Sequence, residues 1–413
     1  MENWNQKNQE KRFAIMAILA MEFNVLAMSA VSPALADLGR AFPDVSQTFM
    51  SMLSTVPALI CVPVSVWATS LVGKKVTFRN IALIGAVLQL LGGLMPMVSG
   101  TFYEVLLWRC VFGIGMGIMA PLGSALMFSI FTKGEAEVQS SRNTMCNSVG
   151  AVIYQLFGGI LCARFGWRYT FLIYALLVPT LTLTMIGFSK IRIANQKFLV
   201  QEEERKQVVA SGKRARYSPA FWGWCTLYMV YCVLFYLLIT DSSVVVLNNN
   251  YGRADSVSII LSVYTLFGML GGLIYRSKKV RDLNSKVFVP IFAGNALAFM
   301  LIVLAKNVLT MTVGAALFGM GYGLFTAAII IFAGYSVPKE LRIGVMARIL
   351  IFTGIGEFVS AFVMDFVKTS IFHSTHERFS FLFAAVCLLI LAVAFLIKPK
   401  SKLFSSDAME ELE

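Results

Sequence analysis

The chain has 413 residues, of which 58% are hydrophobic and 14% are charged. A soluble domain carries about 25% charged residues, so this composition, with a mean hydropathy of +0.74, excludes a disordered chain, a fibrous repeat and an ordinary soluble enzyme. The net charge of +13 would suggest nucleic acid as a partner of a soluble chain. In so apolar a chain, basic loops on one face of a membrane explain it better. We therefore expect an all-α integral membrane protein without a nucleic-acid partner.

Twelve stretches of the chain have the length and composition of membrane-spanning helices. Such a helix needs about 20 mostly apolar residues. In chain order the predicted spans are 13–36, 48–72, 80–98, 102–131, 144–165, 168–188, 219–240, 256–276, 287–305, 309–336, 345–368 and 379–398.

The basic residues divide unevenly between the two sides that these spans define. Both termini and the even-numbered connections hold 26 of the 35 Lys and Arg residues, whereas the odd-numbered connections hold seven. Because basic loops stay on the cytoplasmic side, we predict a multi-pass protein of the cell membrane with both termini in the cytoplasm.

A long polar stretch divides the spans into two sets of six and indicates an internal duplication. Phe112–Gly117 recurs as Phe318–Gly323, and Arg168–Leu172 recurs as Arg378–Leu382. We therefore predict an N-terminal half at 1–188, a cytoplasmic linker at 189–217, and a C-terminal half with a short tail at 218–413. Two parallel six-helix halves are typical of one transporter architecture, with the substrate bound near the midplane between them.

Three short motifs accompany the repeat: Gly73-Lys74-Lys75 between spans 2 and 3; Arg109 with Gly113, Gly115 and Gly117 in span 4; and Gly150, Gly158 and Gly159 in span 5. On these residues the chain resembles the major facilitator superfamily over essentially its whole length. The turn Trp167-Arg168 before span 6 is similar to one in the drug–proton antiporter branch of that family.

The resemblance implies gating and conformational roles for the motif residues, namely Gly73, Lys74, Lys75, Gly113, Gly117, Gly150, Gly158 and Gly159. The chain departs from the family pattern where Val66 and Ser70 replace the leading Gly and the Asp of the loop motif, and where the Gly-Pro pair of span 5 is missing. The glycines also have a simpler interpretation, because small residues four apart let membrane helices approach closely.

Arg109 lies about 10 Å inside span 4 at a rise of 1.5 Å per residue. An arginine at this depth must face protein or a water-filled cavity, because exposing it to lipid is costly. We favour a substrate-binding role for Arg109. The alternative is a structural arginine that donates to carbonyl groups of the first span.

Two acidic residues, Glu22 and Glu357, lie near the middles of their spans. A carboxylate in a low-dielectric environment resists ionisation, so it can gain and lose a proton as its surroundings change. We therefore predict proton-coupling roles for both. For Glu357 a structural hydrogen bond at the interface between the halves is an equal alternative.

Neutral candidates for substrate binding are Asn24, near Glu22, and the tyrosines Tyr228 and Tyr231 of span 7. The cysteines all fall in apolar stretches, and none forms a C-x-x-C pair, so neither a metal site nor a disulfide framework is expected. No Walker A sequence is present. We expect no cofactor, no metal and no enzymatic activity.

The favoured function is secondary active transport by alternating access. The specific prediction is proton-coupled efflux of a small amphiphilic organic solute, an antiport carried out by a monomer. One alternative is a proton-coupled importer or uniporter of a metabolite, such as an organic anion paired with Arg109. Another is a non-transporting membrane receptor on the same fold.

Overall fold

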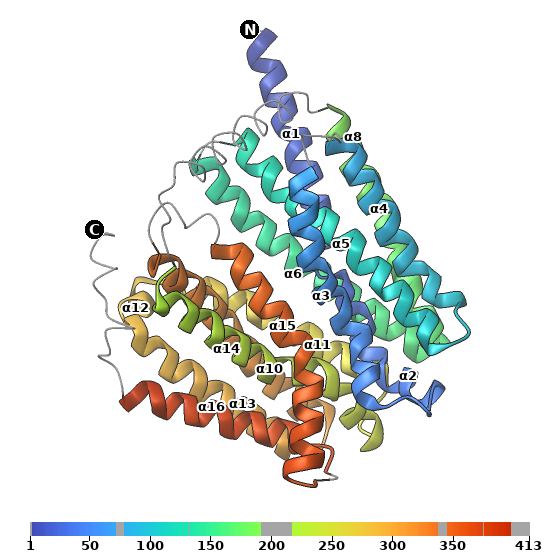
Figure 1. Cartoon of the computed structure of the whole chain (residues 1–413), viewed down its shortest axis with the longest axis vertical. Coiled ribbons are helices and arrows are strands. Elements are labelled where there is room, and N and C mark those ends of the chain that lie inside the picture. Colours follow the sequence, from blue (N-terminus) through green and yellow to red (C-terminus); the bar gives the residue numbers. More distant parts are fainter. Residues whose placement is uncertain are drawn as a thin grey trace. The chain divides into compact units, whose positions relative to one another are not determined.

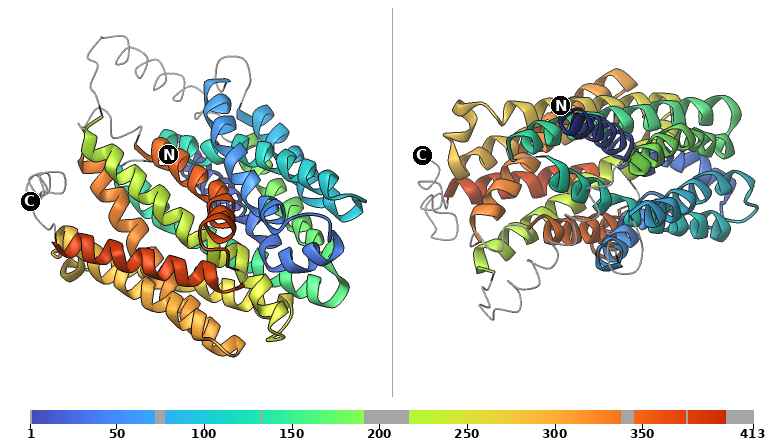
Figure 2. Two further views of the ribbon diagram at one scale, coloured as in Figure 1. Left: turned by 60° about the horizontal axis from the view of Figure 1, so that its bottom comes forward. Right: turned by 90° about the horizontal axis from the view of Figure 1, so that it is seen from above.

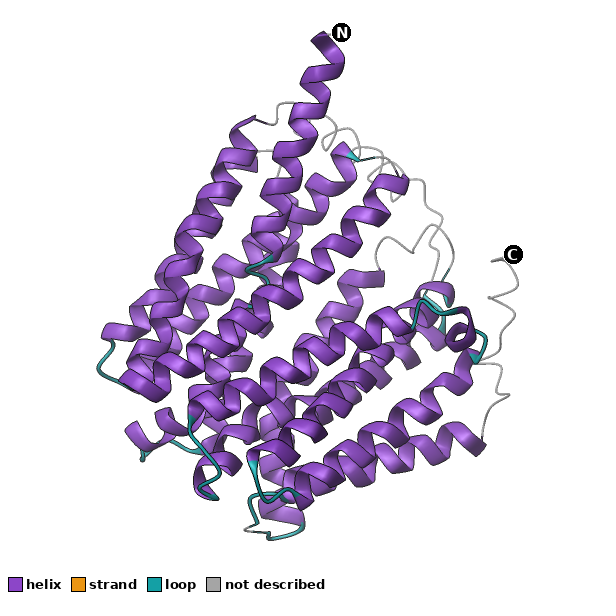
Figure 3. Cartoon of the chain, turned by 180° about the vertical axis from the view of Figure 1, so that it is seen from behind, coloured by secondary structure: helices purple, strands orange, loops and turns teal. Residues whose placement is uncertain are grey.

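The computed structural model describes residues 2–71, 78–131, 133–190, 217–337, 345–374 and 376–397. Every regular element in these ranges is a helix, as the single helix colour of Figure 3 shows. The first part of the chain forms α1 (Glu2–Glu22), η1 (Ala27–Ala34), α2 (Leu35–Ala41), α3 (Gln47–Leu71), α4 (Phe78–Leu94), η2 (Met95–Val98), α5 (Phe102–Ile130), α6 (Lys133–Phe165), α7 (Trp167–Thr170), η3 (Phe171–Leu176) and α8 (Leu177–Lys190).

The second part of the chain continues the helical pattern (Figure 1). It forms α10 (Pro219–Asn248), α11 (Ala254–Ile274), α12 (Lys278–Arg281), η4 (Asn284–Val287), α13 (Phe288–Leu304), α14 (Val308–Tyr335), α15 (Val345–Phe366), η6 (Val367–Ile371) and α16 (Phe379–Ile397). Elements η1 to η4 are 3₁₀ helices, and η6 is a π-helical turn.

Twelve helical stretches among the described residues are long and apolar enough to cross a membrane. They occupy the same twelve places in the sequence as the predicted spans, which confirms the all-α integral membrane fold. One difference is at the end of α10, which continues to Asn248 although its span was expected to end at 240. The polar residues Asp241 and Ser242 remain helical because the Ser242 hydroxyl donates to the Leu238 carbonyl and Asp241 accepts from Thr240 at 2.9 Å.

The chain packs as two compact units. The first comprises Met1–Val31 and Leu53–Arg214, and the second comprises Ser32–Met52 and Ala215–Glu413. Within the second unit, α13 and α16 run side by side, as the orange and red helices of Figure 1 and of the left view of Figure 2 show. The 189–217 linker falls mostly outside the described residues.

Equivalent helices of the two units begin with equivalent caps. At the start of α5 the Thr101 hydroxyl accepts from the backbone N–H of Glu104 at 3.3 Å, and the Glu104 carboxylate accepts in return from the Thr101 N–H. At the start of α14 the Asn307 side chain accepts from the Thr310 N–H at 2.8 Å. Such caps satisfy N–H groups that the first helical turn leaves unpaired.

The two arginines of the sequence repeat, Arg168 and Arg378, make similar contacts. The Arg168 guanidinium donates to the Ser99 carbonyl at 2.8 Å, just beyond η2. The Arg378 guanidinium donates to the Val303 carbonyl at 2.7 Å, at the end of α13. Each arginine therefore satisfies a carbonyl where the third span of its own set of six ends. The two arginines of the sequence repeat thus make the same kind of contact, and the duplication itself stays a prediction.

Candidate functional site

A cavity of about 70 Å³ lies inside the first unit. Its lining comes from α1 and the turn after it, α3, α4, α5 and α8, and consists of Met21, Glu22, Asn24, Val25, Cys61, Gln89, Met116, Met119, Ala120, Gly123 and Leu181. Pockets for whole drug-sized molecules measure about 300–1,000 Å³. A cavity of this size holds a few water molecules or one end group of such a ligand.

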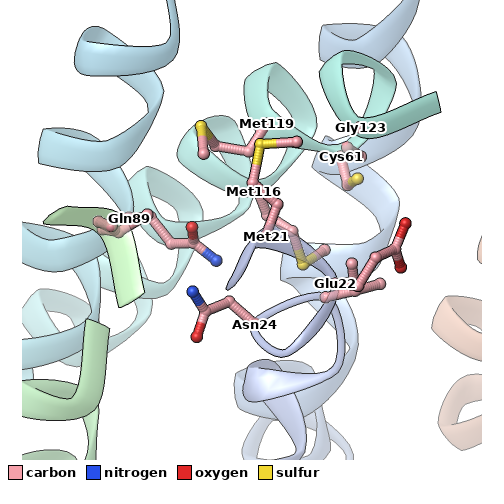
Figure 4. Close-up of a pocket in the computed structure, with 11 residues that line it drawn as sticks. Met21, Glu22, Asn24, Cys61, Gln89, Met116, Met119 and Gly123 are labelled. Atoms are coloured by element: carbon pink, nitrogen blue, oxygen red, sulfur yellow. The ribbon is translucent and has the colours of Figure 1, made fainter. Parts of the chain in front are cut away.

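The cavity wall combines sulfur atoms with a few polar groups. Met21, Met116, Met119 and Cys61 supply thioether and thiol surface. Figure 4 shows the amides of Asn24 and Gln89 pointing toward one another, while the Glu22 carboxylate points to the other side. Methionine side chains are flexible and polarisable, so such a wall adapts to ligands of different shape.

The first span changes its helical form beside this cavity. The α-helix α1 ends at Glu22, and the backbone then follows i→i−3 hydrogen bonds, such as Val25 N–H to Glu22 O at 3.2 Å and Ala27 N–H to Asn24 O at 3.1 Å. Pro33, inside η1, has no N–H for a regular helical bond and obstructs the carbonyl four residues before it. The apolar pattern predicted an uninterrupted span at 13–36, although Pro33 within it indicated a break in the helix.

Asn24 fixes this irregular stretch to two other helices. Its side-chain amide donates to the Ala20 carbonyl at 3.0 Å and to the Thr180 hydroxyl at 2.7 Å, and its oxygen accepts from the Tyr154 hydroxyl at 2.8 Å. Asn24 is 2% exposed. Both of its N–H groups donate to other protein groups. A substrate could therefore donate only to the remaining lone pair of the Asn24 amide oxygen, and the predicted substrate contact stays a prediction.

Arg109 binds the same irregular stretch from α5. Its three guanidinium nitrogens donate to the Leu53 carbonyl at 2.7 Å, the Tyr174 hydroxyl at 2.8 Å and the Met28 carbonyl at 3.0 Å. The side chain is 0% exposed and lies 4.9 Å from the ring centre of Phe112. The structure therefore does not place Arg109 in the cavity wall with Glu22. Its substrate-binding role stays a prediction, and the observed contacts are those of the structural alternative.

Glu22 is the charged residue of the cavity wall. It is half-buried, and a Cβ added at Gly123 of α5 would lie 3.6 Å from its Oε1. It also interacts electrostatically with the thiol of Cys146 on α6. Within the described ranges, no basic side chain forms an ion pair with Glu22. Without a cationic partner, ionisation of the Glu22 carboxyl group at this depth in the membrane costs much free energy.

Comparison with known proteins now identifies the family. The sequence profile of the Major Facilitator Superfamily matches residues 13–279, more than half of the chain. This chain belongs to the Major Facilitator Superfamily. It is accordingly a multi-pass membrane transporter of that superfamily.

Two curated relatives of the superfamily show a limited sequence similarity. The protein named multidrug resistance protein MdtD from Escherichia coli O1:K1 / APEC is 30% identical over 136 residues, and its counterpart from Shigella boydii serotype 18 (strain CDC 3083-94 / BS512) matches equally. In both cases the match covers 33% of this chain and 28% of the relative.

Solved structures of superfamily transporters share the fold. An auto-inhibited POT family peptide transporter superposes with a TM-score of 0.73 and 12% identity, covering 94% of this chain and 96% of that one. A D-xylose–proton symporter superposes with a TM-score of 0.69 and 13% identity, covering 94% and 98%. At such identities the likeness establishes the fold.

The glycines of the superfamily motif in α5 lie against α3. A Cβ at Gly113 would stand 2.8 Å from the Cα of Pro57, and one at Gly117 would stand 2.7 Å from the Cys61 carbonyl. These contacts involve backbone atoms, so a side chain could be accommodated only by moving a helix. Close packing of α3 and α5 thus explains why glycine stands at both positions.

The glycines of α6 lie against the irregular stretch of the first span. Gly150 touches the Phe23 carbonyl, and a Cβ at Gly158 would stand 2.7 Å from the Ala30 carbonyl. Gly159 is also buried. The remaining gating candidates, Gly73, Lys74 and Lys75, lie outside the described residues, and their roles stay predictions.

Glu357 lies on α15 in the second unit, next to a close approach of α10. A Cβ at the adjacent Gly356 would stand 2.6 Å from the Met229 carbonyl. The half-buried Glu357 carboxylate interacts electrostatically with the hydroxyls of Tyr228 and Tyr322 and with the Cys232 thiol. No described basic side chain forms an ion pair with it.

Tyr228 and Tyr231 belong to the aromatic core of the second unit. The ring of Tyr231 stacks on Phe325 with centroids 3.8 Å apart, and its hydroxyl accepts from the Asn295 amide at 2.6 Å. Tyr231 is 0% exposed and Tyr228 is 7% exposed. The structure brings Tyr228, but not Tyr231, next to Glu357, and the substrate contacts of both tyrosines stay predictions.

Two polar residues with unusual surroundings were not predicted from the sequence. Gln89 lines the cavity from α4, and only its position three turns into an apolar span could have drawn attention to it. Asp241 lies in the last turns of α10, hydrogen-bonded to Ser380 and near Lys368. It was assigned to a connection because the hydropathy falls there.

Proposed function

We propose that this protein exports small amphiphilic organic compounds in exchange for protons. In this proposal the N-terminal unit binds part of the substrate in the cavity described above, and Glu22 carries the proton. Both termini face the cytoplasm of a cell whose plasma membrane holds the protein.

The position of Glu22 carries this proposal. It lies at the point where the first span leaves the α-helical form, and it borders the cavity without a basic partner among the described residues. An unpaired acid inside a membrane protein is by default a functional group. A proton that leaves Glu22 when substrate enters, and returns when it departs, would couple the two flows.

The charge of the cavity favours cationic and neutral substrates over an organic anion. Glu22 is the charged residue of its wall, and Arg109 is held by two carbonyl groups and a hydroxyl elsewhere in the unit. This arrangement disfavours the alternative in which Arg109 pairs with an anionic metabolite. The partial likeness to relatives named multidrug resistance protein supports efflux over uptake.

The test uses purified protein reconstituted into liposomes that contain a pH-sensitive dye. A panel of amphiphilic cations and neutral compounds is added under an imposed pH gradient, and proton and solute flux are recorded together. We expect at least one compound to move against its concentration gradient at the expense of the pH gradient. Glu22→Gln should abolish this coupled movement while keeping equilibrium binding, and Glu22→Asp should retain part of it.

Glu357→Gln is the matched control, since it removes an acid at similar depth in the second unit. If Glu22→Gln transports against a gradient at the wild-type rate, Glu22 is not the proton carrier. If Glu357→Gln alone abolishes coupling, the role moves to Glu357. If the wild-type protein moves solute without moving protons, the protein is a uniporter and not an antiporter.

A further inference from the structure

Gln89 presents a carboxamide to the cavity that the protein leaves unpaired. The side chain is 2% exposed, so it is shielded from the surroundings of the molecule. Among the described residues, no group forms a hydrogen bond with the Gln89 amide, which borders the cavity. Asn24 opposite it (Figure 4) has already committed both of its N–H groups. Buried amides are nearly always hydrogen-bonded, so this one requires a partner inside the cavity.

We propose that Gln89 is the specificity-determining residue of a subsite for an uncharged aromatic carboxamide, or for a group with the same adjacent donor and acceptor. The Gln89 amide offers one acceptor and two donors from a single plane. A carboxamide on the ligand offers the complementary pair, so two parallel hydrogen bonds form. Burial of these groups makes the loss of either bond costly.

The rest of the wall fits the aromatic part of such a ligand. Three thioethers and one thiol, from Met21, Met116, Met119 and Cys61, surround the space in front of Gln89. Sulfur atoms make favourable contacts with ring edges. The volume of about 70 Å³ restricts the subsite to one small end group.

The test measures binding of two matched probes to the purified full-length protein in lipid nanodiscs, without any gradient. Benzamide carries the donor and the acceptor, and acetophenone replaces its NH₂ by a methyl group of similar size. Ligand-observed NMR titration should give benzamide an affinity about tenfold higher, as expected for the loss of a buried hydrogen bond. In Gln89→Leu the two probes should bind equally.

Three further variants make the outcome decisive. Gly123→Leu should fill the cavity and prevent binding of both probes, because Gly123 is buried in its wall and an added Cβ would lie 3.1 Å from the Met21 Cε. Gln155→Leu changes an equally buried glutamine of α6 outside the cavity and should keep the preference for benzamide. If Gln89→Leu does not fold, Gln89→Met preserves the length of the side chain and replaces it.

Equal affinities in the wild type would mean that water alone satisfies Gln89, and would overturn the proposal. A preference that survives Gln89→Leu, or no binding of either probe, would overturn it as well. The role of the subsite in transport rests on the proposed function. The binding assay is independent of that function because it involves no proton flux. Failure of proton coupling by Glu22 and failure of ligand recognition by Gln89 therefore give different results.

Discussion

At the scale of single residues, the hydrogen bonds of Arg109 and Tyr174 hold the irregular stretch of the first span. Tyr174 accepts from Arg109 and donates to the Ala27 carbonyl at 3.0 Å, while Arg109 itself donates to Met28 and Leu53. The carbonyl groups of Ala27 and Met28 belong to a segment that lacks the regular α-helical pattern, and the bond to Leu53 joins Arg109 to α3 as well. The two side chains therefore act as positioning residues beside the cavity.

We predict that Arg109→Lys lowers the stability of the purified protein more than Tyr174→Phe does. Lysine keeps the charge but cannot reach three acceptors at once, whereas Tyr174→Phe removes only one donor and one acceptor. Hydrogen bonds to charged groups contribute about 1.5–3 kcal/mol each and neutral ones about 1 kcal/mol. Thermal unfolding in detergent, followed by tryptophan fluorescence, measures the difference; equal midpoints for Arg109→Lys and the wild type would refute this positioning role.

Residue type and depth predicted which polar side chains to inspect, but not what they contact. Arg109 and Glu22 stood out because charges in apolar spans are rare. The favoured role of Arg109 was substrate binding, whereas the structure directs its guanidinium to two backbone carbonyls and the Tyr174 hydroxyl. The Met28 carbonyl lies where the first span departs from the α-helical form. The Leu53 carbonyl lies four residues before Pro57, which has no N–H to pair with it. Gln89 was overlooked because a single neutral amide hardly changes the hydropathy of its span.

At the scale of helices, close approaches position α6 against the first span. Gly150 lies on the Phe23 carbonyl and Gly158 lies near the Ala30 carbonyl, so both contacts involve backbone atoms that cannot rotate away. Glycine spacing was visible in the sequence. That the partner is the irregular stretch of the first span was not, because small-residue pairs indicate close packing without naming the neighbour.

We predict that Gly150→Ala impairs folding and transport, whereas Gly294→Ala does not. A methyl group at position 150 must displace a helix, and such overpacking costs about 1–3 kcal/mol. Gly294, on α13, has nothing within 4 Å of an added Cβ, so alanine should be neutral or stabilising there through its better helix propensity. Expression level, thermal midpoint and liposome flux provide the measurement, and wild-type values for Gly150→Ala would contradict the packing argument.

At the scale of the whole molecule, composition predicted the class, the positions of the apolar stretches predicted the twelve helices, and repeated motifs predicted the duplication. An apolar stretch long enough to cross the bilayer must form a helix, because every backbone N–H and C=O group in lipid must be hydrogen-bonded within the stretch. Packing was harder to foresee. Residues 32–52 group with the second compact unit, although they belong to the first set of six spans. Hydropathy carries no information about such a grouping.

The predicted orientation can be tested with thiol labelling. In a variant without its native cysteines, Gln201→Cys should resist a membrane-impermeant maleimide in intact cells and react after permeabilisation, because its basic segment is expected to stay in the cytoplasm. Arg253→Cys, in an odd-numbered connection, should react in intact cells and serves as the control. Labelling of Gln201→Cys from outside would reverse the topology.

The hydrogen bonds of Tyr174 and Arg109 to the first span also constrain how the protein is synthesised and inserted into the membrane. The carbonyl groups of Ala27 and Met28 receive their donors from Tyr174 and Arg109, which the ribosome synthesises some 150 and 80 residues later, respectively. Until then these carbonyl groups lack their side-chain donors and the stretch keeps only its i→i−3 backbone bonds, whereas hydrocarbon favours fully paired backbone. We expect nascent chains arrested before Tyr174 to remain bound to the insertion machinery or to be degraded by membrane proteases, and chains a few helices longer to be released. Biogenesis would then depend on a checkpoint at the sixth span, set by a tyrosine hydroxyl.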